Sequence, residues 1–414
     1  MDKSLIKWLS VELFFTLNIL VVFSYAILSH DLSQALQLSE SQVGTLGGVF
    51  FFAYASALLV LGTLFGSVST RWLMFLSAAI SSMGTMMLGL SENLVTAVIA
   101  RILMGIGFST AFVGTVHVIN REYPEKFALM TAVSQSFSNF MGALIGLISA
   151  LFPILSEFRA PFKIYAALLA LNALLMLLVL DGDNGRKTAS KVDKIRTSPR
   201  DFFGIALIAL RSPQMWICAV YFSGIFGTFL AYADIWDIVF QIRTFEHSGA
   251  TAAMINSSLP IGLTLGGLVS GWWAERSGFV TPTRVFSIAA WLLLAGMSLH
   301  PLSIETAGFL MFWIGFALSA SAISLATLPL HLPPEAVSIG TSIVLTAAFM
   351  SGGILSSLVG STLDGLSLSE FSTYQTSMYL MIGALSLSCL ASFLFKGKSP
   401  RQQEAKINQP PEGT

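Results

Sequence analysis

The stretch Asp181–Arg211, DGDNGRKTASKVDKIRTSPRDFFGIALIALR, is the least hydrophobic internal part of this chain. It carries seven basic residues, which are Arg186, Lys187, Lys191, Lys194, Arg196, Arg200 and Arg211. On either side lie about 180 and 200 residues of nearly continuous apolar sequence. This arrangement predicts two membrane-embedded halves joined by a basic linker on the cytoplasmic side of the membrane.

The composition supports a membrane protein. Hydrophobic residues make up 54% of the chain and charged residues only 11%, whereas a soluble domain has roughly 25% charged residues. A water-soluble fold could not bury so much apolar surface, so we expect a polytopic membrane protein. The net charge is zero, which indicates no nucleic-acid partner. Cys218 and Cys389 both fall within apolar runs and imply no disulfide framework.

Twelve apolar segments are long enough for helices that cross the hydrocarbon, which takes about 20 residues each. They are continuous runs without the alternation of barrel strands, so the predicted fold is all-α. The predicted spans are 8–28, 43–65, 72–90, 95–118, 128–150 and 162–180, then 213–233, 250–274, 284–303, 306–328, 336–361 and 372–395.

These spans divide the chain into four parts. We predict a six-helix half over 1–180, the linker over 181–212, a second six-helix half over 213–395 and a polar tail over 396–414. The linker includes a short amphipathic stretch, 201–210, that we expect at the membrane interface. The tail carries Pro410 and Pro411 and is expected to be disordered.

The two halves resemble each other at a nearly constant spacing. Tyr123-Pro124-Glu125 precedes the fifth span, and Pro333-Pro334-Glu335 precedes the eleventh, 210 residues later. Gly142 matches Gly352 at the same offset, and Ile106-Gly107-Phe108 matches Ile314-Gly315-Phe316 at an offset of 208. Two like-oriented halves with a site between them are typical of secondary transporters.

The loop after the eighth span carries a recognisable motif, Gly271-Trp272-Trp273-Ala274-Glu275-Arg276-Ser277-Gly278. It resembles the major facilitator signature G-x-L-a-D-R-x-G, with Glu275 in the acidic place, Arg276 in the basic place and Gly278 in the turn. The resemblance implies two six-helix halves around a central cavity, with a cytoplasmic gate at this loop. A solvated pair of surface charges is the alternative.

The first half carries an incomplete copy of this motif. Gly62 and Leu64 fit the signature and Arg71 follows it, but Gly66 stands where the acid belongs. The first-half loop therefore lacks the usual acidic contact, and we expect an asymmetric gate that depends on Glu275 and Arg276.

Arg101 is the only basic residue well within a predicted span. The sequence Arg101-Ile102-Leu103-Met104-Gly105-Ile106-Gly107 resembles the family's R-x-x-x-G-x-G motif in the fourth helix. A guanidinium at membrane depth needs water, a counter-ion or a substrate, so we predict that Arg101 binds substrate. Gly105 and Gly107 would allow close helix packing around it. The alternative is an arginine that reaches back to the membrane surface.

A second glycine motif, Gly142-Ala143-Leu144-Ile145-Gly146, is a G-x-x-x-G pattern that favours helix packing. Drug antiporters of the family often carry G-P-x-x-G-G here, so the departure disfavours that class. The stretches Phe51-Phe52-Ala53-Tyr54-Ala55, Ala111-Phe112-Val113-Gly114 and Tyr123-Pro124 to Leu129 resemble one branch of the superfamily. That branch contains phagosomal nutrient transporters of bacteria and the lysosomal dipeptide transporter, which implies amino-acid-like or peptide-like substrates.

Other polar residues in the spans are further candidates. Asn18, Tyr25, Asn139 and Asn256 are candidate substrate ligands, and a helix–helix hydrogen bond is the alternative for Asn139. Pro260 frees a backbone carbonyl and could open its helix next to Asn256.

Three carboxyls are candidate proton carriers, and the sequence does not decide among them. Glu12 lies near the predicted cytoplasmic end of the first helix, where an interfacial position is the alternative. Asp234 and Asp237 follow the predicted end of the seventh helix, where solvated loop carboxylates are equally expected.

We therefore predict a proton-coupled symporter that moves a small polar solute across the inner membrane by alternating access and acts as a monomer. An exporter of a siderophore or drug is the alternative. A membrane enzyme is disfavoured, because the five histidines are scattered and no H-E-x-x-H or G-x-S-x-G motif is present. We expect neither a cofactor nor a metal ion.

Charge asymmetry gives a testable topology. With the N-terminus in the cytoplasm, inside segments hold 18 Lys and Arg residues and outside loops hold 3. Alkaline phosphatase, which needs an oxidising compartment, should therefore be inactive when fused at Lys191 or after Lys398. It should be active near Gln37 and Ser367. High activity of the Lys191 fusion would contradict this orientation.

Overall fold

Every regular element in the described part of the computed structural model is a helix, and the strand-type contact is an isolated bridge between Phe65 and Val68. The structure describes residues 2–61, 65, 68–151, 158–182, 199–299, 302–365 and 370–396. The predicted all-α fold is therefore confirmed. The predicted disorder of the tail, and most of the linker, lie outside these residues.

The first half contains seven α-helices and a short 3-10 turn. They are α1 (Lys3–Ala35), α2 (Glu40–Leu61), α3 (Thr70–Gly89), α4 (Leu94–Phe108), α5 (Ala111–Glu122), η2 (Pro124–Lys126), α6 (Phe127–Leu151) and α7 (Arg159–Val179). Helix α8 (Pro199–Leu210) lies within the predicted linker, at the place of the expected amphipathic stretch, and packs against α16.

The second half repeats this plan with more interruptions. It contains α9 (Pro213–Ala231), the π-helix η4 (Tyr232–Trp236), α10 (Asp237–Arg243), α11 (Gly249–Ser277), α12 (Val280–Met297), α13 (Ile304–Leu318), α14 (Ser321–Leu325), α15 (Leu328–His331), α16 (Pro334–Gly365) and α17 (Glu370–Leu394).

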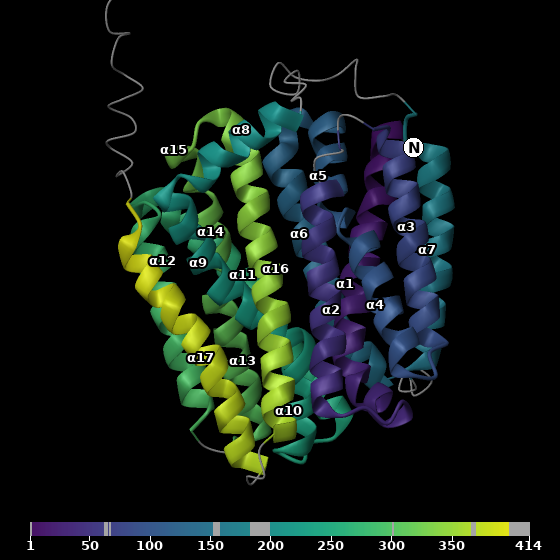
Figure 1. The fold of residues 1–414 in the computed structure, drawn as a ribbon, viewed down its shortest axis with the longest axis vertical. Helices are drawn as coiled ribbons and strands as arrows, with labels where there is room; N and C mark the ends of the chain where they lie inside the picture. The colour runs from purple at the N-terminus through teal and green to yellow at the C-terminus, as the bar shows by residue number, and fades with distance from the viewer. Residues whose placement is uncertain are drawn as a thin grey trace, which may run out of the picture.

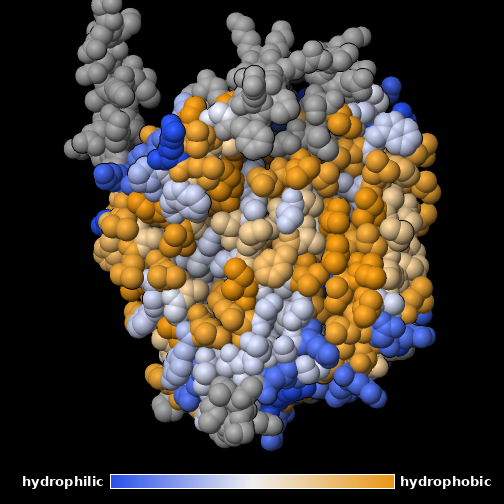
Figure 2. Space-filling model, in the orientation of Figure 1, coloured by the Kyte–Doolittle hydropathy of each residue, from blue (hydrophilic) through white to orange (hydrophobic). Residues whose placement is uncertain are grey.

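These helices match the predicted spans closely. Eleven helical rods in the described residues are long and apolar enough to cross a membrane, and α6, with 25 residues, occupies the place of the predicted fifth span. Figure 2 shows hydrophobic side chains across the middle of the visible face and hydrophilic ones gathered toward its ends. The chain is thus a multi-pass membrane protein.

The helices run between two faces of the bundle (Figure 1). The N-terminus and α15 lie on one face in Figure 1. Asp181 pairs with Lys7 near the start of α1, and the Lys396 carbonyl is 2.9 Å from a ring nitrogen of His331 in α15, so both residues lie on this face. We call this the linker face. The other, here called the opposite face, carries the ends of α2 and α16 at Glu40 and Asp364. The start of α1 and Lys396, the last described residue, lie on one face, which agrees with an even number of spans.

The helix breaks confirm the internal repeat. The fourth span is interrupted between Phe108 and Ala111, and the tenth between Leu318 and Ser321, 210 residues later in both cases. Close contacts repeat as well. A Cβ on Gly105 would lie 2.5 Å from the Phe50 carbonyl, and one on Gly315 would lie 2.0 Å from the Leu259 carbonyl.

The predicted Ile-Gly-Phe match at an offset of 208 was therefore wrong, because the structure pairs Gly105 with Gly315 at an offset of 210. A short apolar tripeptide recurs easily by chance in helices of this composition. The Tyr123 and Gly142 matches have the structural offset.

The predicted end of the seventh span at residue 233 was also wrong. Helices α9, η4 and α10 form one rod from Pro213 to Arg243. The span is predicted to end before Asp234 and Asp237 because charged side chains avoid the hydrocarbon unless they are buried in protein. Here Asp234 and Asp237 are 3% and 0% exposed, so they lie inside the bundle.

The two halves are closed against each other at the opposite face. Helix α2 packs along α16, and a Cβ on Gly44, Gly48 or Gly360 would lie 2.5–2.7 Å from a backbone oxygen of the other helix. Arg243 forms an ion pair with Glu40 of the first half. Asp364 accepts hydrogen bonds from the backbone N–H groups of Glu40 and Ser41, at 2.9 and 2.8 Å.

This contact predicts the effect of a larger side chain. Replacement of Gly48 by Leu should prevent closure, because a Cβ there would lie 2.7 Å from the Gly353 carbonyl. Ser356 is fully buried beside this seam. We would place a cysteine at position 356 in a background without native cysteines. It should react several-fold faster with a thiol reagent in the Gly48→Leu variant than in the protein that keeps Gly48.

The matched control is Gly271→Leu in α11, where a Cβ would meet nothing within 4 Å. This variant should leave the labelling rate at position 356 unchanged. Equal rates in both variants would mean that the seam between α2 and α16 does not govern closure.

Candidate functional site

Arg101 lies at the centre of the candidate site. It sits two turns into α4 and is only 1% exposed, so the alternative of an arginine that reaches the membrane surface is wrong. Its guanidinium carbon lies 3.9 Å from the centroid of the Tyr25 ring and 4.3 Å from that of Phe50. Cation–π contacts of this kind are worth about 2 kcal/mol or more when desolvated, so the rings offset part of the cost of burial.

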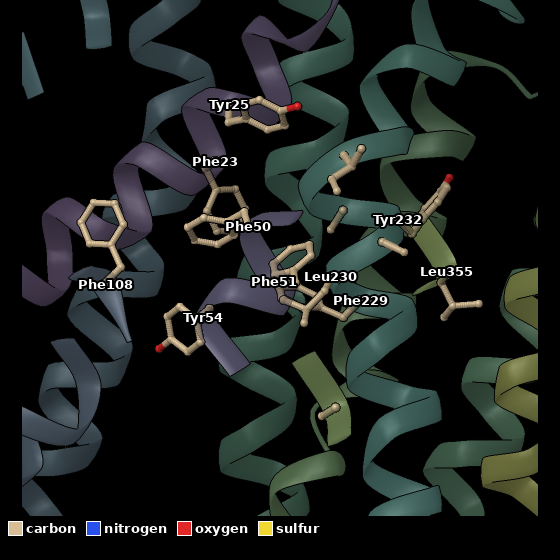
Figure 3. Packing of buried hydrophobic residues seen from close by; sticks show 14 of the residues in the cluster. Phe23, Tyr25, Phe50, Phe51, Tyr54, Phe108, Phe229, Leu230, Tyr232 and Leu355 are labelled. Atoms are coloured by element: carbon tan, nitrogen blue, oxygen red, sulfur yellow. The ribbon is translucent and has the colours of Figure 1, made fainter. Parts of the chain in front are cut away.

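The aromatic residues around Arg101 come from several elements. In Figure 3, Tyr25, Phe50 and Phe51 come from first-half helices, and Phe229 and Tyr232 come from the second-half rod, with Phe51 drawn beside Phe229. All five belong to one buried cluster. The guanidinium is therefore placed at the junction of the two halves.

The edge of the guanidinium is only partly occupied. Nε of Arg101 donates a hydrogen bond to the Leu46 carbonyl at 3.2 Å. Nη1 is buried and has no hydrogen-bond partner among the described residues. Asp234 of the second half interacts electrostatically with Arg101, but the described residues form no ion-pair contact between them.

Asp234 reaches this junction from the π-helix η4. Its Oδ1 is buried and, like Nη1 of Arg101, lacks a hydrogen-bond partner in the described structure. The same segment packs on α2, where Ile235 and Trp236 occupy the space beside Gly47 and Gly44. A buried carboxylate and a buried guanidinium, each with an unpaired atom, thus interact electrostatically across the junction without an ion-pair contact. The sequence-based alternative of a solvated loop carboxylate is wrong for both Asp234 and Asp237.

Asp237 has a different environment. Its Oδ2 accepts a hydrogen bond from Asn256 Nδ2 at 3.0 Å, and its Oδ1 accepts one from Gln241 Nε2 at 3.2 Å. Gln241 Oε1 lies 3.0 Å from Nδ1 of His247 near the opposite face. The second proton of the Asn256 amide goes to the Ala233 carbonyl at 2.9 Å. Two amide donors therefore hold this carboxylate as an acceptor.

Glu12 is also buried, so the alternative of an interfacial residue is wrong. It lies in a polar seam between α1 and α6, where Ser138 donates to its Oε1 at 3.0 Å and Thr16 lies 3.0 Å from Ser138. Its Oε2 has no hydrogen-bond partner among the described residues. One turn earlier, Trp8 donates to Ser134 across the same seam.

The structure thus separates the predicted ligands. It brings Arg101, Tyr25 and Asp234 together and places Asn256 beside Asp237, while Glu12 lies elsewhere. Asn18 is buried on α1 with an unpartnered Oδ1, and Asn139 is half-buried on α6. Sequence reasoning missed Phe50, Gln241 and Ser138, because nothing in an apolar run marks which phenylalanine, amide or hydroxyl will meet a charge.

The predicted packing glycines lie at close approaches. A Cβ on Gly107 would lie 2.3 Å from the Ser81 hydroxyl, and one on Gly142 would lie 2.8 Å from Ile19. Gly105 meets Phe50, which itself lies over Arg101. Gly146 lies within α6.

Among the described residues, Glu275, Arg276 and Arg71 form no ion pair or hydrogen bond across the halves. Glu275 and Arg276 are exposed at the end of α11, and Arg276 lies 4.2 Å over the ring of Trp272 on its own helix. Gly278 has a φ of 82°, the left-handed region that favours glycine. Arg71 donates to the Leu177 carbonyl within the first half. Gly62 and Gly66 lie outside the described residues.

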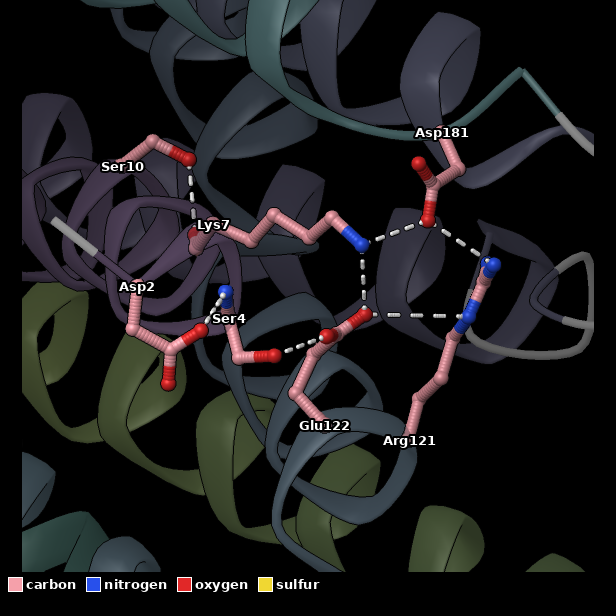
Figure 4. Close-up of polar contacts among 7 residues, drawn as sticks. All are labelled: Asp2, Ser4, Lys7, Ser10, Arg121, Glu122 and Asp181. Atoms are coloured by element: carbon pink, nitrogen blue, oxygen red, sulfur yellow. Dashed lines mark hydrogen bonds and ion pairs between the residues drawn. The ribbon is translucent and has the colours of Figure 1, made fainter.

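Charged residues at the linker face instead tie the first half together (Figure 4). Lys7 forms ion pairs with Glu122 at 3.0 Å and Asp181 at 2.7 Å, and Arg121 pairs with Asp181 at 2.9 Å. Ser4 donates to Glu122 at 2.7 Å. These contacts join the ends of α1, α5 and α7 in one rigid cluster.

An apolar groove of about 690 Å³ lies between α3 and α7. Its lining includes Met83, Leu90 and Leu174, all of which are exposed. The groove is therefore on the outer surface of the first half and contains none of the Arg101 site.

Comparisons with known proteins identify the fold and family. The chain is 23% identical over 395 residues to the MFS-type transporter olcL of Penicillium canescens, covering 78% of this chain and 68% of that protein. The solved nucleoside transporter NupG superimposes with a TM-score of 0.72 at 17% identity, covering 96% of this chain and 100% of NupG.

A second solved structure gives the same result. A bacterial homologue of the human lysosomal transporter Spinster, in an inward-facing and unoccupied conformation, has a TM-score of 0.71 at 15% identity and covers 99% of both chains. At such identity these likenesses establish the fold. The family profile described as Major Facilitator Superfamily matches residues 12–357. The chain therefore belongs to the Major Facilitator Superfamily of transporters.

Proposed function

We propose that this protein is a proton-coupled secondary transporter of a small zwitterion, amino-acid-like or peptide-like. The observation that carries this proposal is the pair of buried, unpartnered atoms between the halves, Nη1 of Arg101 and Oδ1 of Asp234. A carboxylate would accept hydrogen bonds from the guanidinium, and an ammonium group would donate to Asp234. One zwitterion thus supplies both missing partners.

The residues around Arg101 indicate which anionic group of the ligand it would bind. Tyr25 and Phe50 both pack their rings against the guanidinium, and the Leu46 carbonyl occupies its Nε. The remaining guanidinium nitrogens are left for a ligand, and their planar fork suits the two oxygens of a carboxylate. The branch resemblance, with its amino-acid-like and peptide-like substrates, agrees with this ligand.

The proposed cycle is alternating access. The structure is closed at the opposite face by α2, α16 and the Arg243–Glu40 pair. We place the linker face and both termini in the cytoplasm and the chain in the inner membrane, as the charge asymmetry predicts. When the linker face closes, the loop around Gly62 and Arg71 and the loop around Glu275, Arg276 and Gly278 would approach each other and form the cytoplasmic gate.

The residues next to each of the three candidate carboxyls suggest a different role for each. Asp234 faces Arg101 and suits the substrate amine, whereas amide donors hold Asp237. Glu12 has hydroxyl neighbours and no cation among the described residues. An ionised carboxyl in such a place is costly, so we assign the coupling proton to Glu12.

Arg101 and Asp234 should recognise opposite ends of one ligand. A thermal-shift screen would compare alanyl-alanine with its N-acetyl derivative and its C-terminal amide. The wild-type protein should prefer alanyl-alanine over both. Arg101→Ala should remove the preference over the amide, and Asp234→Asn should remove the preference over the N-acetyl compound. Each loss should be on the order of 10- to 100-fold in affinity, as expected for a hydrogen bond to a charged group.

Lysine should not replace Arg101, because it keeps the charge but loses the planar fork. Arg159→Lys at the opposite face is the matched control, since Arg159 also lies over an aromatic ring but outside the site. If Arg101→Ala reaches the membrane and binds alanyl-alanine as the wild type does, the site assignment is wrong. The same holds if none of the three compounds stabilises the wild-type protein.

Glu12→Gln should uncouple transport from protons. The amide mimics the protonated acid, so uptake of alanyl-alanine driven by an imposed pH gradient should be lost while exchange of labelled for unlabelled dipeptide continues. Glu92→Gln, at an exposed carboxyl, is the control and should leave both unchanged. Uptake driven by a sodium gradient and indifferent to a pH gradient would rule out proton coupling.

A further inference from the structure

The rod that carries Asp234 is not a regular α-helix. Between Tyr232 and Trp236 it widens into the π-turn η4, in which the N–H of Asp237 bonds to the Tyr232 carbonyl five residues earlier. Such turns occur mostly as single bulges inside α-helices, and often at functional sites. In an α-helix this N–H would bond to Ala233 instead. The π-turn therefore leaves the Ala233 carbonyl in need of another donor.

Asn256 of α11 supplies that donor. Its Nδ2 donates to the Ala233 carbonyl at 2.9 Å and to Oδ2 of Asp237 at 3.0 Å. Asn256 is buried, and so are Asp237 and Gln241, which donates to the other carboxylate oxygen. One amide thus bridges the carbonyl inside the π-turn and the carboxylate that follows it.

This bridge separates two carboxylates that a regular helix would keep together. Side chains three residues apart on an α-helix share a face. Here Asp237 is bonded to α11, whereas Asp234 interacts with Arg101 in the first half. The next residue of the turn, Ile235, also contacts the first half, because its side chain fills the space beside Gly47 of α2.

We propose that Asn256 and Asp237 are positioning residues, which hold the π-turn open and thereby aim Asp234 at the amine of the substrate. The proposal rests on the function assigned to Asp234 above. It gives Asn256 and Asp237 no contact with substrate, because the Asn256 amide nitrogen bonds to Ala233 and Asp237, and both Asp237 oxygens bond to Asn256 and Gln241.

A double-mutant comparison tests this proposal. Asn256→Leu keeps the size of the side chain but removes the hydrogen-bond donor. The ratio of the affinity for alanyl-alanine to the affinity for N-acetyl-alanyl-alanine should therefore fall by about ten-fold. In an Asp234→Asn background the same substitution should cause no further loss, since the carboxylate it positions is gone. Affinity for the free carboxylate, measured against the amide derivative, should not change in either background.

The control is Ser257→Ala, one residue further along α11, whose hydroxyl donates to Ala253 of its own helix. It should leave both preferences unchanged. If Asn256→Leu does not reach the membrane, Asp237→Asn provides a milder variant with the same expectation. Equal losses with and without Asp234 would overturn the proposal, because Asn256 would then act independently of it.

The outcome separates this inference from the proposed function. If Asp234→Asn alone keeps the preference for a free amine, the role of Asp234 in substrate binding is wrong. If Asp234→Asn loses that preference and Asn256→Leu adds its own loss on top, only the positioning role is wrong.

Discussion

A guanidinium held in the middle of an apolar bundle is the constraint on which the rest of the site depends. Insertion scales put the cost of an arginine at the centre of a membrane helix at about 2.5–3.5 kcal/mol. The chain offsets this cost with two aromatic faces and one backbone carbonyl, all from the first half. Asp234 in the second half adds an electrostatic attraction, but it forms no ion pair with Arg101 among the described residues. The charge is therefore only partly compensated, and part of that compensation comes from a group in the other half, which moves relative to it when the halves rock.

The three buried carboxyls show how neighbours give one functional group different tasks. Asp234 faces a cation, Asp237 receives two amide donors, and Glu12 lies among hydroxyls. A cation favours the ionised form, amide donors fix an acceptor in place, and hydroxyls accept or donate as the proton comes and goes. Their order along the chain carries none of this information, since the two aspartates are only three residues apart.

The sequence predicts the spans, the duplication and the place of Arg101 within a span, because each depends on composition, spacing or an isolated charge. It fails where tertiary contacts decide. Charged residues at 234 and 237 suggest the end of a helix, yet partners on α4 and α11 keep them inside one. The π-turn depends on a single side chain on another helix, Asn256, and no local pattern reveals it. The closure at the opposite face is hidden likewise, because Glu40 and Asp364 are 324 residues apart.

The contact between Asp364 and the start of α2 links the conformational change to hydration, because it must break when the opposite face opens. Helix α2 has no residue of its own half bonded to the N–H groups of Glu40 and Ser41 in the described structure, and Asp364 of the other half caps them instead. A helix that loses such a cap is destabilised by about 0.5–2 kcal/mol. Opening this face therefore exposes the start of α2, and water must take over the two amides at the moment when the passage opens. Wetting of the opposite face is thus built into the movement itself, and solutes that lower water activity would bias the protein toward the form closed at this face.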